Sequence, residues 1–78
     1  RESKLPNREF KLLCFLAENP NLVFSKEQLF EKIWGYDYVS DAATVSVHIN
    51  RLREKIEDDA RNPQIIETIW GAGYRLNL

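Results

Sequence analysis

The sequence has few of the residues on which catalytic and metal sites depend. Its 78 residues include one cysteine, Cys14, and one histidine, His48. A single cysteine leaves no partner within the chain for a disulfide or a cysteine-rich metal site, and it is typical of a reducing compartment such as the cytoplasm. A catalytic or metal-binding histidine needs partner residues that the chain does not supply. We therefore expect no enzyme activity, no metal and no cofactor.

Long apolar runs and an excess of positive charge are also missing. No run approaches the ~20 apolar residues of a membrane-spanning helix, and no signal peptide is visible. The net charge is −1 and the isoelectric point about 5.8. Because nucleic-acid-binding domains usually carry a clear basic excess, any DNA binding by this chain has to come from local placement of charge. The length and a hydrophobic content of 44% fit one small globular domain.

The chain begins with a predicted helix. Asn7 is the expected N-cap, and the helix ends near Glu18, before Asn19-Pro20-Asn21. Four residues at helical spacing, Phe10, Leu13, Cys14 and Ala17, predict one apolar face. Leu12, Phe15 and Leu16 widen this face beyond a single stripe, so we expect the helix to contact more than one partner. Cys14 is interpreted as a small core residue in preference to a reactive thiol.

A second helix is predicted after the β-prone residues 22–24, which we expect to pair weakly with another strand. Ser25 and Gln28 have the spacing of a capping box at the start of this helix, and Gly35 is suited to end it. The residues predicted to face the core are Leu29, Phe30, Ile33 and Trp34.

Residues 41–58, DAATVSVHINRLREKIED, predict the central helix of the domain. Its apolar residues form one stripe about three turns long, made by Val45, Ile49, Leu52 and Ile56. Ser40 or Asp41 is the expected N-cap. The opposite, outward arc holds Ala43, Thr44, Val47, Asn50, Arg51 and Glu54, with His48 and Lys55 along one edge and Ser46 and Arg53 along the other.

The outward arc combines side chains that can read base pairs. Arginine pairs with guanine edges, asparagine with adenine edges and a valine methyl with the thymine methyl, while cations bind phosphate. Binding in the major groove is therefore one interpretation. An ordinary solvated surface with three basic residues, Arg51, Arg53 and Lys55, fits the helix alone equally well. Asp58 and Asp59 are interpreted as a solvated helix end in preference to half of a metal or acid–base site.

The C-terminal part of the chain predicts a β-hairpin. Residues 64–70 have strand character, Gly71-Ala72-Gly73 makes a tight connection, and residues 74–77 return. Glycine suits the connection because it adopts positive φ, and no helix follows that would make it a phosphate-binding loop. Three helices and a hairpin predict an α+β, mainly α fold, the winged helix-turn-helix, as a single domain over residues 1–78.

Short motifs carry a family resemblance from about Leu5 to Arg75. In chain order they are Glu9-Phe10 with Leu12-Leu13, Val23-Phe24-Ser25, Leu29, Trp34-Gly35, Thr44-Val45, Val47-His48-Ile49, Arg51-Leu52-Arg53 with Lys55-Ile56, Glu67-Thr68-Ile69 and Gly71-Ala72-Gly73-Tyr74-Arg75. Each piece is common. Their combined order and spacing resembles the OmpR/PhoB-type DNA-binding domain of two-component response regulators.

The resemblance implies a transcription regulator that binds double-stranded DNA in the cytoplasm. In this family the third helix lies in the major groove and the hairpin wing reaches the minor groove. The loop formed here by Tyr36, Asp37 and Tyr38 can face RNA polymerase. Full-length members carry an N-terminal receiver domain, phosphorylated by a sensor histidine kinase in a phosphorelay, and bind direct repeats as a head-to-tail dimer. We expect that receiver, and most of the sheet that precedes the first helix in the family, to lie outside these 78 residues.

The residue types on the third helix assign roles. Arg51 is the best candidate for a base-edge contact, with Asn50 and Val47 beside it. The remaining expected contacts are Thr44, His48 and Arg53 to phosphates, and Thr68 and Trp70 from the wing. On this assignment Arg51→Ala weakens binding to the specific site by about 1–3 kcal/mol, whereas Lys55→Ala changes little.

Three residues, Ala43, Trp70 and Arg53, complicate this assignment of DNA contacts. Ala43 and Trp70 stand where the family often has arginine, at the start of the third helix and in the wing. Trp70 is expected to support the wing or to act as a hydrophobic strand residue in preference to packing on sugars. Arg53 could equally pair with Glu57 one turn along the helix. The two missing cations predict weak DNA binding by an isolated domain, and a winged helix that binds a protein partner is the alternative function.

Overall fold

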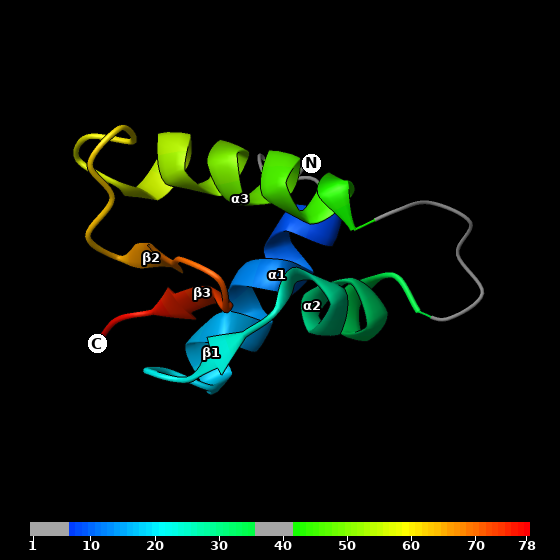
Figure 1. Cartoon of the computed structure of the whole chain (residues 1–78). Coiled ribbons are helices and arrows are strands. Elements are labelled where there is room, and N and C mark those ends of the chain that lie inside the picture. Colours follow the sequence, from blue (N-terminus) through cyan, green and yellow to red (C-terminus); the bar gives the residue numbers. More distant parts are fainter. Residues whose placement is uncertain (1–6, 36–41) are drawn as a thin grey trace.

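The computed structural model describes residues 7–35 and 42–78, which form three helices and a three-stranded antiparallel sheet (Figure 1). The helices are α1 (Asn7–Glu18), α2 (Lys26–Ile33) and α3 (Ala43–Ile56), and the strands are β1 (Val23–Phe24), β2 (Ile66–Ile69) and β3 (Gly73–Leu76). The sheet order is β1-β3-β2. The mainly α, winged-helix fold is thus confirmed. Within the described residues no helix is both long and apolar enough to cross a bilayer.

The core lies where the three helices meet the hairpin. In Figure 1, α3 lies across the top of the molecule, with α1, α2 and the sheet below it. The buried apolar side chains are Leu12, Leu16, Leu29, Phe30, Val45, Ile49, Leu52, Ile66 and Leu76. The stripe predicted on α3 is confirmed, because Val45, Ile49 and Leu52 are inaccessible to solvent and Ile56 packs against the same cluster. The opposite face of α3 is therefore turned outward.

The buried face of α1 differs from the prediction. Leu12 and Leu16 are inaccessible, whereas Phe10 is 51% exposed and Ala17 is also exposed. The helix carries apolar residues on several sides, so its periodicity alone does not show which side the rest of the domain covers. The covered side is the one that contacts α2, α3 and β3. A charged residue, Glu9, is buried on it as well.

The local signals at α2 are confirmed. The Ser25 hydroxyl accepts a hydrogen bond from the Gln28 amide at 3.0 Å, and the Gln28 side chain accepts one from the Ser25 amide at 2.8 Å. Gly35 follows the C-cap with a φ of 92°. Trp34 stacks on the Phe30 ring with 5.3 Å between centroids.

The start of α3 differs from the expected one. Its N-cap is Ala42, which makes no side-chain capping hydrogen bond. The two residues predicted for this role, Ser40 and Asp41, lie outside the described residues, as does the predicted polymerase-facing loop of Tyr36, Asp37 and Tyr38.

The hairpin is shorter on its first strand than predicted. β2 begins at Ile66, and the amides of Gln64, Ile65 and Ile66 donate to the Glu57 carboxylate where the chain enters the strand. It ends at Ile69, so Trp70 lies in the turn and is not a strand residue, which corrects the prediction. The Ala72 amide closes this turn on the Ile69 carbonyl at 2.9 Å.

The weak strand predicted at residues 22–24 pairs with the hairpin. Val23 lies opposite Arg75 and Phe24 opposite Tyr74. The backbones of β1 and β3 are so close that a Cβ on Gly73, whose φ is 145°, would lie 1.9 Å from the Phe24 carbonyl oxygen. A glycine is therefore required where the hairpin meets β1.

Candidate nucleic-acid interface

The outward face of α3 presents the predicted contact residues to solvent. Val47 is 48% exposed, and Asn50 and Arg51 are exposed beside it. Thr44 and His48 are half-buried. His48 Nδ1 lies 3.0 Å from the Thr44 carbonyl oxygen, and its ring is perpendicular to that of Trp34, with 4.9 Å between the ring centroids. The imidazole is thereby held in one orientation at the side of this face.

Arg51 and Lys55 both reach a buried carboxylate on α1. Lys55 Nζ donates to Glu9 Oε1 at 2.8 Å, and Arg51 NH1 lies 3.9 Å from Glu9 Oε2. The Glu9 side chain is 1% exposed, whereas that of Arg51 is 58% exposed. Glu9 Oε2 is buried and has no hydrogen-bond partner within the described part of the chain. Arg51 can thus reach a ligand, while Lys55 is committed to a contact inside the protein.

Arg53 is turned inward, although the sequence placed it at the edge of the exposed arc. The residue is only 9% exposed. Its Nε and NH2 donate to the Ile66 carbonyl at 3.0 and 2.8 Å, and NH2 also donates to the Thr68 hydroxyl at 2.8 Å. Its guanidinium carbon lies 5.7 Å from the centre of the Tyr74 ring. These contacts join α3 to both strands of the hairpin.

Glu57, the alternative partner predicted for Arg53, binds backbone amides. Its carboxylate accepts hydrogen bonds from Gln64, Ile65 and Ile66 at 2.7 to 3.0 Å. Partial desolvation raises the pKa of Glu57, but these three amide hydrogen bonds and the nearby Arg53 charge outweigh it and leave the pKa below the usual value. Glu57 therefore fixes the point at which the chain enters the wing.

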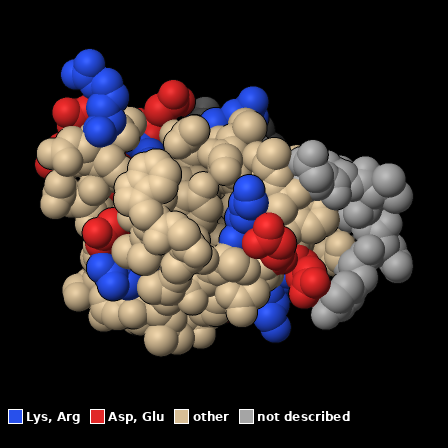
Figure 2. All heavy atoms as spheres, viewed as in Figure 1, with Lys and Arg blue, Asp and Glu red and all other residues tan. Residues whose placement is uncertain are grey.

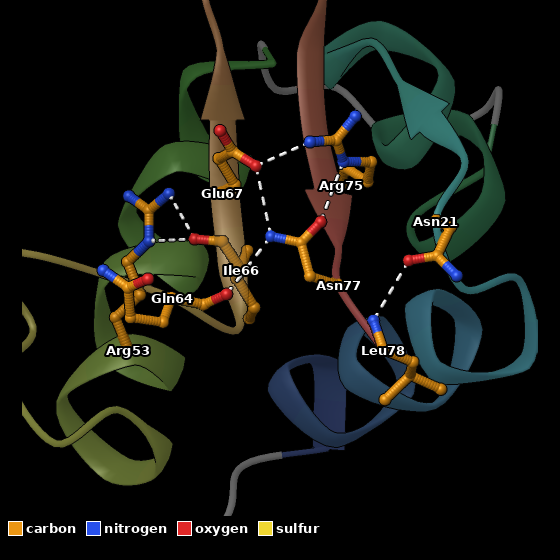
Figure 3. A network of polar contacts seen from close by, with 8 residues as sticks. All are labelled: Asn21, Arg53, Gln64, Ile66, Glu67, Arg75, Asn77 and Leu78. Carbon is orange, nitrogen blue, oxygen red and sulfur yellow. Dashed lines mark hydrogen bonds and ion pairs between the residues drawn. The ribbon is translucent and has the colours of Figure 1, made fainter.

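A second polar network lies at the base of the hairpin (Figure 3). The Arg75 side chain donates to Glu67 Oε1 at 2.7 Å and to Asn77 Oδ1 at 2.8 Å, and the Asn77 amide donates to Glu67 Oε1 at 3.1 Å. The hydrogen bonds from Asn77 and Arg75 lower the pKa of Glu67. Glu67 and Arg75 are a cross-strand pair, so the network stabilises the register of the hairpin.

The tip of the wing is apolar and exposed. Trp70 is 92% exposed. Beside it an open groove of about 270 Å³ separates the wing from the start of α2, and its lining includes Lys26 and Tyr74. On the face shown in Figure 2, acidic and basic side chains are scattered around a broad uncharged area. Nucleic-acid contacts on this face would therefore depend on individual side chains and not on a continuous basic surface.

The acidic residues after α3, which the sequence raised as half of a possible metal or acid–base site, belong to a turn. Asp59 Oδ1 accepts a hydrogen bond from the Arg61 amide at 3.0 Å and lies 3.6 Å from the Arg61 side chain, as part of the turn after α3. Within residues 7–35 and 42–78 there is no group of three or more potential metal ligands. Sequence reasoning missed the roles of Glu9, Glu57 and Tyr74. Glu9 and Tyr74 entered only as parts of the family motifs and Glu57 only as a possible partner of Arg53, because nothing local in the sequence shows the long-range contacts that they make.

Comparison with known proteins gives a consistent result. Residues 1–76 match the family of transcriptional regulatory protein C-terminal domains. The response regulator SaeR of Staphylococcus aureus is 53% identical over 68 residues, which cover 87% of this chain and 30% of SaeR. The chain thus spans about a third of the length of such relatives.

Solved structures agree with the sequence matches. The response regulator DrrB of Thermotoga maritima, an OmpR/PhoB homologue, superposes with a TM-score of 0.84 and 41% identity over 94% of this chain and 33% of DrrB. The Klebsiella pneumoniae RstA DNA-binding domain, solved in complex with the RstA box, superposes with a TM-score of 0.81 and 30% identity over 94% of this chain and 72% of that domain. With its winged-helix fold and its match over residues 1–76, this chain belongs to the OmpR/PhoB-type C-terminal DNA-binding domains that regulate transcription.

Proposed function

We propose that this chain is the effector domain of a two-component response regulator, and that it binds DNA with α3 in the major groove and the hairpin wing at the minor groove. The observation that carries the proposal is the outward face of α3, where Asn50 and Arg51 are exposed opposite the apolar stripe that packs into the core. Polar side chains in this pattern match the donor and acceptor edges of base pairs. The wing is attached to the side of the same helix through Arg53.

The contacts divide by residue type and exposure. Arg51 binds a guanine edge, with Asn50 and Val47 beside it for adenine and thymine. Thr44 and His48 bind the phosphate backbone next to the helix. Trp70, exposed at the wing tip, packs on sugars at the minor groove, because an indole ring cannot supply the cation that arginine would bring there.

The whole protein extends this function to further partners. Its relatives are named response regulators and are about three times as long as this chain, which supports a receiver domain phosphorylated by a sensor histidine kinase. We propose a head-to-tail pair on direct-repeat sites, with Tyr36, Asp37 and Tyr38 facing RNA polymerase. A bacterial regulator of this kind works in the cytoplasm, where chromosomal DNA lies. The protein itself has no catalytic role.

Selection from a randomised duplex pool tests the DNA-binding mode. We expect enrichment of a short motif repeated in one orientation about 10–10.5 base pairs apart, with affinity that falls steeply with salt. No enrichment at low salt, together with protein capture that is indifferent to salt, would instead support the alternative of a winged helix that binds a protein partner.

Arg51→Ala tests the orientation of α3. The variant is expected to lose about 1–3 kcal/mol of specific binding and to relax the base preference at one position. Arg61→Ala is the matched control, because it removes the same charge from the turn beyond α3, where the side chain is 94% exposed. The control is expected to leave the base preference unchanged. An Arg51 variant with an unaltered preference would show that another face of the domain meets the bases.

A further inference from the structure

Arg53 is the most heavily hydrogen-bonded cation that links α3 to the wing, and its environment is unlike that of a phosphate-binding arginine. It is 9% exposed, and two of its nitrogens donate to the carbonyl of Ile66, the first residue of β2. A guanidinium that binds phosphate usually presents its planar edge to solvent. Here the edge formed by Nε and NH2 is already occupied inside the protein.

The second bond from NH2 determines how Thr68 can act. A guanidinium can only donate, so the Thr68 oxygen accepts at 2.8 Å. The single hydroxyl proton of Thr68 then cannot point toward Arg53 and is directed to another acceptor. The positive charge also polarises the hydroxyl and strengthens it as a donor. Thr68 is half-buried, so part of it remains accessible from solvent.

A second attachment joins the same rung of the hairpin to α3. Thr68 lies opposite Tyr74 in the β2–β3 register, so the two side chains share one face of the hairpin. The Tyr74 hydroxyl lies 3.0 Å from the Ser46 hydroxyl on α3. Ser46 and Arg53 are seven residues apart in the sequence, about 10 Å along the helix axis. Two attachments at this separation act together with the Glu57 contacts and the pairing of β1 with β3, and they fix the angle of the wing along α3.

We propose that Arg53 is a positioning residue: with the Ser46–Tyr74 pair it holds the wing at a fixed angle to α3, and it orients the Thr68 hydroxyl to donate to a phosphate oxygen of the DNA backbone. This inference rests on the proposed DNA-binding function. It replaces the direct Arg53–phosphate contact expected from the sequence. The wing tip follows two residues after Thr68, so the same attachment sets where Trp70 meets the DNA.

The test uses the duplex that the unaltered chain selects, with two footprints read on each variant. Protection of guanine N7 from methylation reports α3 in the major groove, and protection from hydroxyl radicals reports the backbone beside the wing. Thr68→Val removes the hydroxyl and keeps the shape, and we expect about a tenfold loss of affinity with loss of the wing footprint alone. Thr68→Ser, which keeps the hydroxyl, restores both.

Arg53→Lys separates positioning from charge. Lysine keeps the positive charge but not the planar pair of donors, so we expect the same footprint as Thr68→Val and no added loss when the two changes are combined. If Arg53 bound phosphate directly, Arg53→Lys would bind much like the unaltered chain, and this result would overturn the inference. An unchanged wing footprint in Thr68→Val would also overturn it.

Two further outcomes are covered by the same set of variants. If Arg53→Lys fails to fold by circular dichroism, the comparison of Thr68→Val with Thr68→Ser decides the question, and Tyr74→Phe, which removes only the second attachment, is expected to weaken the wing footprint. If the unaltered chain binds no duplex, the DNA-binding function fails and the inference fails with it. Binding by the unaltered chain with unaltered footprints in the variants refutes the inference alone.

Discussion

Removing the Lys55 ammonium should destabilise the fold, although Lys55 stands on an outward edge of α3. In Lys55→Met the aliphatic stem remains, and only the charge and its hydrogen bond to Glu9 Oε1 are lost. Glu9, whose side chain is 1% exposed, then keeps the Arg51 guanidinium 3.9 Å from Oε2, too far for a hydrogen bond. This effect is on stability, so it is separate from the expectation that changing Lys55 has little effect on DNA binding.

The magnitude follows from the unequal burial of the two partners. Breaking a fully buried ion pair on one side costs about 3–5 kcal/mol, and an exposed pair contributes about 0–1 kcal/mol. Since the Lys55 side chain is 39% exposed and Glu9 is enclosed, we expect a loss of about 2 kcal/mol between these limits. For a domain of this size that corresponds to a fall of roughly 8–16 °C in the melting temperature.

Urea and thermal unfolding measure this loss directly. Lys32→Met, on the exposed face of α2, is the matched control and is expected to stay within about 0.5 kcal/mol of the unaltered chain. The double variant Glu9→Met with Lys55→Met should recover most of the loss, because replacing both partners of a buried pair by apolar residues is often neutral. A Lys55→Met stability equal to that of the control would refute the assignment of Glu9 as a buried, Lys55-dependent carboxylate.

Three other predictions concern the wing. Gly73→Ala should cost more than about 2 kcal/mol in unfolding experiments, because its Cβ meets the β1 backbone, whereas Gly71→Ala, with open space and a φ of 79°, should cost about 1 kcal/mol. The pKa of Glu57 is lowered in the fold, so its carboxylate stabilises the folded state above the ordinary carboxyl pKa of 4.5, and this contribution is lost as pH falls below that value. The stability difference between the unaltered chain and Glu57→Gln should therefore shrink over that range in urea titrations. Trp70→Arg should leave the melting temperature unchanged and steepen the salt dependence of DNA binding by about 0.9 in logarithmic slope; an unchanged slope would place the wing tip away from phosphate.

Much of the architecture could be predicted from the sequence because it depends on near neighbours. The apolar stripe of α3, the capping box at Ser25 and the turn at Gly71 are set by residues within about one to three helical turns or one tight turn of each other. The outward face with Asn50 and Arg51 followed from the same stripe, since burial of one side exposes the other. These local patterns also carry the family resemblance that the comparisons confirm.

The sequence by itself therefore determined the elements, their order and the face of α3 that meets solvent. Only the tertiary structure decided which long side chains remain available on that face. Arg53 bonds to Ile66, 13 residues away, and Lys55 to Glu9, 46 residues away. Periodicity gives the direction in which a Cβ leaves the helix, but a flexible arginine or lysine extends several ångströms further, and its end point depends on acceptors brought close by packing. The same reason explains α1, where several apolar sides competed and the contacts with α2, α3 and β3 selected one.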